Sequence, residues 1–176
     1  MAPRGDVDQR IADATLELLR TRGPRGVTVE AVTARSGIAK TTIYRRYTDR
    51  RDMLSAALER LAPTQPPGTD VAPRERLRWV IAHAVEAVDA GIGFGGFAAL
   101  LTDEDAEFTE VFRRILAGQR AALEQVIEDS WAGVDAATLI DALVGAYTAE
   151  RARTGAVADG WEERLFDLFW PVVSSV

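Results

Sequence analysis

The sequence contains no cysteine and only one histidine, His83, among its 176 residues. Without cysteine the chain can form no disulfide, zinc ribbon or iron–sulfur cluster, and it has no thiol nucleophile. A single histidine rules out a multi-histidine metal site and leaves His83 as the only base for a serine-histidine-aspartate triad. These shortages argue against an enzyme, and we expect neither a metal nor a cofactor.

Long apolar segments are scarce as well. No uninterrupted apolar run approaches the roughly 20 residues that a membrane-spanning helix needs, and residues 1–10 lack the apolar core of a signal peptide. Apolar residues make up 47% of the chain and charged residues 27%, which is typical of a folded protein with a sizeable core. We therefore expect a cytoplasmic protein with no membrane partner.

Positive charge is confined mostly to the N-terminal third. The net charge is −6, but residues 1–61 hold 12 Lys and Arg against 8 Asp and Glu. That segment has a net charge of +4, whereas residues 62–176 have −10. This asymmetry predicts a basic module that meets a polyanion, joined to a larger acidic body that does not.

Apolar residues recur with the period of an α-helix along nearly the whole chain. From Ile11 to Leu19 they follow the spacing i, i+3, i+4, i+7, i+8, which predicts a helix over residues 7–22. Similar patterns predict helices over 28–35, 39–47, 49–61, 73–90, 103–131, 135–154 and 161–174, with a short apolar piece near 94–102. No alternating strand pattern is present, so the sequence predicts an all-α fold of about nine helices.

Two of these helices surround a tight glycine turn at Gly37, which is the pattern of a helix-turn-helix. In the second, residues 39–47, Ile43 and Tyr47 are spaced to pack inward, and the remaining face is crowded with hydroxyl and basic groups. Such groups can contact phosphates and base edges in a major groove. The alternative is a pair of surface helices with a solvated basic face, which the combined cap, turn and tyrosine spacing disfavours.

Residues 28–55 resemble the DNA-binding signature of the TetR family of bacterial transcriptional regulators. The matching motifs are Thr28 at the cap, Ser36-Gly37-Ile38 at the turn, Thr42-Ile43-Tyr44 and Tyr47 in the recognition helix, and Asp52-Met53-Leu54 after it. The sequence departs from the family at Thr33 and Ser36, where alanine is usual. The resemblance implies an N-terminal three-helix DNA-binding domain followed by a helical ligand-binding and dimerisation domain.

Carried over residue by residue, the resemblance implies two groups of DNA contacts. The phosphate contacts would be Thr28, Lys40, Tyr44 and Arg50. The base contacts would be Thr41, Thr42 and Arg46, with Arg45 able to make either contact. The implied partner is double-stranded DNA with a palindromic operator, bound by a homodimer.

The implied function is a ligand-responsive transcriptional regulator, most simply a repressor that a small-molecule inducer releases from its operator. An activator of the same family is one alternative. The other, from a different class, is a helical small-molecule-binding protein or enzyme with an incidental basic segment. We expect the DNA-binding domain over residues 1–48 and the ligand-binding and dimerisation domain over 49–176, with a connection at 63–73 that contains four prolines.

The acidic body would hold both the dimer interface and the inducer site. Its last two helices carry more apolar surface than packing on one neighbour requires. The residues expected at the dimer interface are Leu139, Leu143, Tyr147, Leu165, Phe166, Phe169 and Trp170. Intramolecular core is the alternative interpretation of the same residues.

The central helices carry a partly aromatic set that would enclose an apolar or aromatic ligand. These candidate ligand-binding residues are Trp79, His83, Phe94, Phe97, Phe108, Phe112, Ile115 and Gln119. Plain hydrophobic core is again the alternative, because aromatic residues at helical spacing are common in cores.

Two short motifs in the acidic body have simple interpretations. Residues 91–96 match the glycine pattern of dinucleotide-binding loops, but no strand precedes them, so we expect a flexible turn between helices that could act as a hinge. Thr102 and Asp105 have the spacing of a capping box for the helix that follows.

Overall fold

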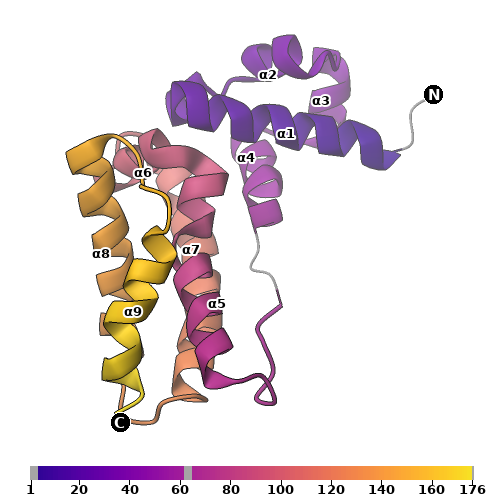
Figure 1. The fold of residues 1–176 in the computed structure, drawn as a ribbon. Coiled ribbons are helices and arrows are strands. Elements are labelled where there is room, and N and C mark those ends of the chain that lie inside the picture. The colour runs from indigo at the N-terminus through magenta and orange to yellow at the C-terminus, as the bar shows by residue number, and fades with distance from the viewer. Residues whose placement is uncertain (1–3, 62–64, 176) are drawn as a thin grey trace. The chain divides into compact units, whose positions relative to one another are not determined.

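A computed structural model describes residues 4–61 and 65–175, in which every regular element is a helix (Figure 1). The prediction of an all-α fold is therefore confirmed. The α-helices are α1 (Arg4–Arg22), α2 (Val29–Ser36), α3 (Lys40–Arg46), α4 (Arg50–Leu58), α5 (Pro73–Glu86), α6 (Gly93–Leu101), α7 (Ala106–Glu128), α8 (Ala136–Thr154) and α9 (Trp161–Val173). The shorter elements are the 3-10 turns η1 (Pro24–Gly26) and η2 (Glu59–Leu61) and the π-helix η3 (Ala87–Ile92).

The chain packs into two compact units that do not follow the order of the sequence. One unit comprises Met1–Ala62 and Ala87–Ala117, and the other comprises Pro63–Glu86 and Gly118–Val176. Helices α4 and α6, the π-helix η3 and the first half of α7 thus pack with the N-terminal helices. The structural units differ from the functional domains expected over 1–48 and 49–176, and the functional boundary at residue 48 remains a prediction.

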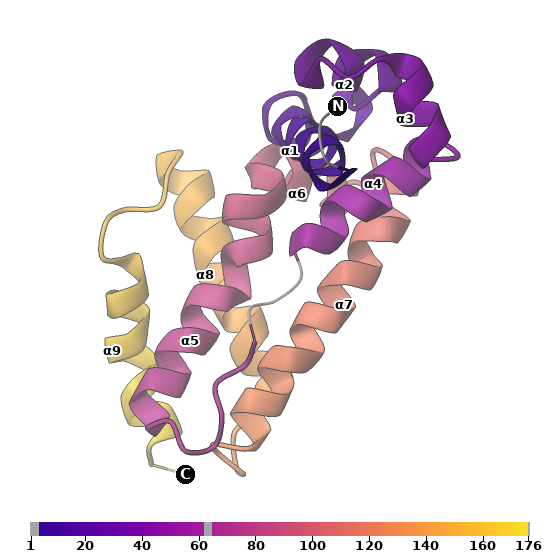
Figure 2. The same cartoon turned by 90° about the vertical axis from the view of Figure 1, so that its right-hand side faces the viewer.

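Helix α1 is the central element of the first unit. It packs against α2, α4 and α6, and Figure 2 shows it nearly end-on with these helices around it. Its side chains Ile11, Leu18 and Leu19 are buried, as their helical spacing predicts. The apolar residues of the N-terminal segment therefore build a core that supports the two short helices α2 and α3.

The second unit is built around α5, which packs against both α8 and α9 (Figure 1). Leu77, Val80 and Ile81 of α5 are fully buried in this packing. The Asp135 side chain accepts a hydrogen bond from the Thr138 N–H (2.6 Å) and caps α8, and Gly155 ends that helix with φ 77°. The predicted bounds of α8 and α9 therefore agree closely with the structure.

The connection between α5 and α6 differs from its prediction. Residues 91–96 were expected to form a flexible turn, but η3 continues the helix to Ile92 and α6 begins directly at Gly93. The backbone at the start of α6 leaves the usual helical conformation at Gly93, where φ is 70°, a value that glycine adopts without strain. The Arg20 guanidinium donates hydrogen bonds to the carbonyl oxygens of Ala90 and Gly91 (both 3.2 Å), which holds this connection against α1.

The predicted capping box at the start of α7 is also wrong. The Thr102 hydroxyl donates to the Ala98 carbonyl oxygen (3.0 Å) and belongs to the end of α6. The cap is the Asp105 carboxylate, which accepts a hydrogen bond from the Phe108 N–H (3.0 Å). Helix α7 accordingly begins at Ala106 and not near residue 103.

The helical stretch Pro73–Leu101 is long and apolar enough to cross a membrane by length and composition, with a mean hydropathy of 1.5 in its most apolar window. The expectation that no segment approaches this length overlooked it, because Glu86 and Asp89 interrupt the apolar run. Half of that window is buried inside the protein, as in the core helix of a soluble protein.

Candidate nucleic-acid interface and ligand site

Helix α2, the first helix of the helix-turn-helix, is capped at both of its ends. Thr28 is extended, and its hydroxyl oxygen accepts a hydrogen bond from the Ala31 N–H (3.1 Å), which caps α2. Gly37 ends α2 with φ 68°, and its N–H donates to the Thr33 carbonyl oxygen (3.0 Å). The cap and turn expected from the sequence are therefore present.

Ser36, where the family usually has alanine, stabilises this turn. Its hydroxyl oxygen accepts a hydrogen bond from the Ile38 N–H (3.1 Å), and its carbonyl oxygen accepts one from the Arg10 guanidinium (2.6 Å). The other departure, Thr33, is less well accommodated, because its hydroxyl is buried without a partner among the described residues. The serine at position 36 therefore stabilises the helix-turn-helix, whereas the threonine at position 33 destabilises it.

Helix α3 has one buried face and one exposed face. Ile43 is buried as predicted, whereas Tyr47 at the end of the helix is only half-buried. Burial nevertheless raises the pKa of the Tyr47 hydroxyl, with the negative charge of Asp8 acting in the same direction. The exposed residues predicted to contact DNA from this helix are Lys40, Thr41, Tyr44 and Arg45, and Thr42 is half-buried.

Lys40 and Tyr44 form a small exposed cluster with Glu30 of α2. The Lys40 ammonium pairs with the Glu30 carboxylate and lies 5.6 Å from the centre of the Tyr44 ring. The hydrogen bond and charge of Glu30 raise the pKa of Lys40, and the hydrogen bond from Lys40 lowers the pKa of Glu30. Lys40 is therefore fully charged near neutral pH, and a phosphate could replace Glu30 as its partner.

Arg46 does not lie where the resemblance placed it. Its guanidinium Nε donates to the carboxylate of Asp8 on α1, and only 17% of its side chain is exposed. This ion pair holds the side chain against α1, so the prediction that Arg46 faces bases does not fit the geometry. In the structure this contact joins α3 to α1.

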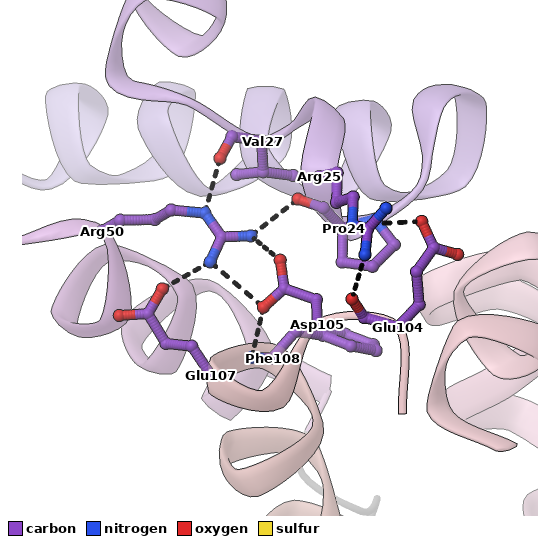
Figure 3. Close-up of polar contacts among 8 residues, drawn as sticks. All are labelled: Pro24, Arg25, Val27, Arg50, Glu104, Asp105, Glu107 and Phe108. Atoms are coloured by element: carbon purple, nitrogen blue, oxygen red, sulfur yellow. Dashed lines mark hydrogen bonds and ion pairs between the residues drawn. The ribbon is translucent and has the colours of Figure 1, made fainter. Parts of the chain in front are cut away.

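Arg50 is bound from several sides within the first unit (Figure 3). Its guanidinium donates to the carbonyl oxygens of Val27 and Pro24 (both 2.7 Å) and to the carboxylate of Asp105 (2.6 Å), and it pairs with Glu107. Because these partners engage all three guanidinium nitrogens, the predicted phosphate contact does not fit. Arg50 instead fastens η1 and the start of α4 to the first turn of α7.

The Asp105 carboxylate is one of the two anionic partners of Arg50 in this network. Its burial alone would raise its pKa, but hydrogen bonds from the Phe108 N–H and from Arg50, with the charge of Arg50, outweigh that effect. The pKa of Asp105 is therefore held below its ordinary value. Nearby, Arg25 pairs with Glu104 (3.5 Å) and donates to its carbonyl oxygen (2.8 Å), which adds a second tie at the same place.

The predicted ligand residues are only partly brought together. Trp79, His83 and Gln119 border a hollow of the second unit, which Glu86 and Leu123 complete. It has a volume of about 10 Å³, room for roughly one water molecule. Sequence reasoning missed its last two residues, although Glu86 is three residues from His83 and Leu123 is four from Gln119, the spacings of neighbours on a helix.

The remaining aromatic candidates lie in the first unit. Phe108 and Phe112 are fully buried with stacked rings 5.6 Å apart, as expected of core residues. Phe94 and Phe97 are neighbours with ring centres 6.5 Å apart, and Ile115 is half-buried. A shared role of these five residues in binding a ligand remains a prediction.

His83 has a defined orientation beside the hollow. Its Nδ1 lies 2.7 Å from the Trp79 carbonyl oxygen, which can only accept, so Nδ1 carries the proton. The two rings are stacked with centres 4.3 Å apart, and Nε2 lies 3.6 Å from the Glu86 carboxylate. The stacked rings of Trp79 and His83 therefore form a flat aromatic pair beside the hollow.

The apolar residues expected at the dimer interface are mostly buried within a single chain. The buried members are Leu139, Leu143, Tyr147, Leu165 and Phe166, and the half-buried members are Phe169 and Trp170. The buried five therefore support the alternative of an intramolecular core, in which α8 and α9 pack on α5. Leu168 and Val172, which are 62% and 59% exposed, are the apolar residues that α9 leaves open.

Residues 11–57 match the family described as "Bacterial regulatory proteins, tetR family". This range contains α2 and α3, most of α1 and most of α4. The N-terminal helices form a tetR-family DNA-binding domain. The resemblance inferred from residues 28–55 is thereby confirmed. That the exposed face of α3 contacts DNA remains a prediction.

Solved structures match the chain well beyond the tetR-family domain. They include an HlyIIR mutant protein with a linker substitution (11% identity, TM-score 0.72, covering 94% of this chain and 96% of that one). Others are a TetR transcription regulator from Haloarcula marismortui (18%, 0.67, 98% of each chain) and FadR from Bacillus subtilis (18%, 0.62, 96% and 98%). No curated protein sequence matches. At these identities the structures show a shared fold, in which a tetR-family domain precedes a helical body.

Proposed function

We propose that the protein is a cytoplasmic transcriptional repressor that binds a palindromic operator as a homodimer and is released by a small molecule. The observation that carries this proposal is the exposed, hydroxyl-rich and basic face of α3 in a tetR-family domain. Helix α3 has only seven residues, but Ile43, the Gly37 turn and the Arg46–Asp8 pair fix its orientation. A helix held in this way can be inserted into a major groove without further ordering.

The contacts with DNA follow from exposure and chemistry. Lys40 and Tyr44 would bind phosphates, and so would the hydroxyl of Thr28, which can still donate while its oxygen caps α2. Thr41, Thr42 and Arg45 would contact base edges. Arg46 and Arg50 would act by positioning α3 and α4, since both guanidinium groups are engaged within the protein.

A homodimer would place two recognition helices about one helical turn of DNA apart. The exposed apolar residues of α9, Leu168 and Val172, support this assembly, because a two-fold contact between copies would remove them from water. The symmetry of such a dimer matches a palindromic operator.

Control by a ligand is supported by the fold. The FadR structure, which shares this fold, is a complex with stearoyl-CoA, a ligand with a long apolar part. In this protein the hollow beside Trp79 is nearly closed, and a ligand would therefore favour a conformation in which it is open. The release of DNA would follow from that shift in population, within the limit set by the ligand's differential affinity for the two states.

The test is fluorescence anisotropy of the purified protein on DNA from its own upstream region and on a scrambled duplex, over a series of salt concentrations. We expect salt-dependent binding that favours the upstream fragment. Equal, weak binding to both, followed by a genome-wide binding selection that recovers no preferred sequence, would contradict the proposal. A promoter–reporter measurement separates a repressor from an activator. Deleting the gene of a repressor raises expression from the promoter that it controls, whereas deleting the gene of an activator lowers it.

A further inference from the structure

Arg76, near the start of α5, is a buried cation without a described anionic partner. Only 4% of the residue is exposed. In the part of the chain that the structure describes, its one hydrogen bond joins Nη1 to the Asp129 carbonyl oxygen at 3.5 Å, the limit for such a bond, and Nε has no partner. The Asp129 carboxylate accepts from the Gln125 amide instead (2.9 Å).

A charge in this position is costly. Burial removes nearly all of the residue from water, and in folded proteins the cost of burying a charge is offset by a paired anion or by several good hydrogen bonds. The weak contact with the Asp129 carbonyl suits a cation near the end of α7, but it involves Nη1 alone. The edge formed by Nε and Nη2 makes no hydrogen bond within the described residues, so the protein itself does not explain why an arginine is buried here.

The unused edge has the geometry of a carboxylate receptor. Two parallel N–H groups on one side of a guanidinium match the two oxygens of a carboxylate. Arg76, Trp79 and His83 are spaced i, i+3 and i+7 and therefore share one face of α5. Trp79 and Leu123 border the hollow together with the polar residues His83, Glu86 and Gln119. The apolar side chain of Trp79 therefore lies about one helical turn along α5 from the charge.

We propose that Arg76 receives the acid group of the inducer, which is a carboxylic acid with an apolar body. The carboxylate pairs with Nε and Nη2, and the apolar part lies along α5 toward Trp79 and Leu123. This inference rests on the proposed function and narrows its ligand from an apolar or aromatic molecule to an amphipathic acid.

The position of this site explains how the acid would influence DNA binding. The hollow holds about one water molecule, so an acid can enter only if α5 and the C-terminal half of α7 move apart. Helix α5 leads into η3, whose carbonyl oxygens bind Arg20 of the tetR-family domain. Helix α7 begins at the Asp105 cap that holds Arg50. Both helices therefore lead along the chain from the acid site to residues that are hydrogen-bonded to the tetR-family domain.

The first test compares the thermal stability of two ligand-free variants, Arg76→Met and Arg78→Met. Arg78 is a matched control on the same helix, because it pairs with Glu163 (2.8 Å) and lies over the Phe166 ring (3.9 Å). We expect Arg76→Met to raise the melting temperature by about 2–8 °C, since it removes an unpaired buried charge. Arg78→Met should lower it. A melting temperature of Arg76→Met below that of the wild type would show a structural role and overturn the proposal.

The second test measures binding directly by calorimetry, with octanoic and dodecanoic acids and the alcohols of equal length as probes. We expect an acid to bind the wild type at least about 10-fold more tightly than its alcohol. This preference should disappear in Arg76→Met and remain in Arg78→Met. Equal affinity for acid and alcohol, or no binding of any probe, would overturn the proposal.

These measurements contain no DNA, so they separate this inference from the proposed function. If an acid binds through Arg76 and the protein also releases its operator, both are supported. If the acid binds but the protein has no preferred DNA sequence, the acid site stands and the proposed function fails. If the protein binds its operator but shows no preference for acids, only the acid site is overturned.

Discussion

Lys40 and Arg50 lie ten residues apart in one basic segment, but their neighbours give them different roles. Lys40 is exposed, and a phosphate could replace Glu30, its carboxylate partner among the described residues. Arg50 is engaged by two carbonyl oxygens and two carboxylates. The phosphate contact of Lys40 remains a prediction. The contacts of Arg50 could not be predicted from the sequence, because Asp105 and Glu107 are more than fifty residues away along the chain.

We expect Lys40→Ala and Arg50→Ala to weaken DNA binding in different ways. Lys40→Ala should reduce the dependence of log K on log salt by about one unit, because one phosphate contact is lost. Arg50→Ala should lower affinity but leave the salt dependence unchanged, since it displaces the recognition helix without removing a phosphate contact. Anisotropy titrations over a salt series measure both quantities. A slope reduced equally by the two substitutions would place Arg50 on DNA after all.

The buried hydroxyl of Thr33 yields a prediction about stability. Thr33→Val should raise the free energy of unfolding by about 1 kcal/mol, because it removes a buried hydroxyl that has no described partner and keeps a similar shape. Thr15→Val is the matched control. The Thr15 hydroxyl is also buried but donates to the Ile11 carbonyl oxygen (2.8 Å), so its loss should not stabilise the protein. Urea denaturation compares the two variants, and a stabilising Thr15→Val would contradict this reasoning.

At the scale of elements, the helices that follow local rules were predicted well. Apolar spacing gives α1, α8 and α9, and the cap at Thr28 with the Gly37 turn gives α2 and α3. The connection from α5 to α6 could not be predicted in this way. A π-helix has no sequence signature as strong as a cap, and η3 depends on Arg20 of α1, seventy residues away, for its carbonyl partners. The same applies to α7, whose first turn is joined to Arg50.

Asp105, which caps the first turn of α7, should make the free energy of unfolding depend on pH. The pKa of Asp105 is lowered in the folded protein, so its contribution is fully present above its ordinary pKa of 3.8 and is lost as pH falls through the folded value. We therefore expect the wild type to be more stable than Asp105→Asn near neutral pH, and the difference to shrink below about pH 4. Denaturation curves between pH 2 and 7 measure this difference. A constant difference at all pH values would show that the charge of Asp105 contributes nothing.

At the scale of the whole molecule, the exposed apolar residues of α9 concern assembly. The sequence predicted an interface on α8 and α9 but included side chains that the single chain buries, because periodicity reports burial without saying what covers the residue. Leu168 and Val172 are the large apolar residues of α9 that the single chain leaves exposed. They are four residues apart and therefore lie on one face of the helix. The proposed dimer depends on this face.

Leu168→Glu should therefore convert the dimer to a monomer and weaken operator binding, because a charge would be buried between two copies. Its effect on the fold of each chain should be small, since Leu168 is 62% exposed. Leu101→Glu, at a leucine of the first unit that is 66% exposed, is the matched control and should leave the assembly unchanged. Sedimentation equilibrium gives the mass of each variant. A dimeric Leu168→Glu protein would move the interface elsewhere.

Helix α7 has a mechanical consequence because it is a single unbroken helix of 23 residues. At 1.5 Å per residue it is a rod about 34 Å long. A rod of that length that tilts by about 5° about one end carries its other end through about 3 Å, close to the 3.4 Å between successive base pairs. A small rotation of α7 about its Glu128 end would thus move its Ala106 end by a distance comparable with the spacing of two successive base pairs.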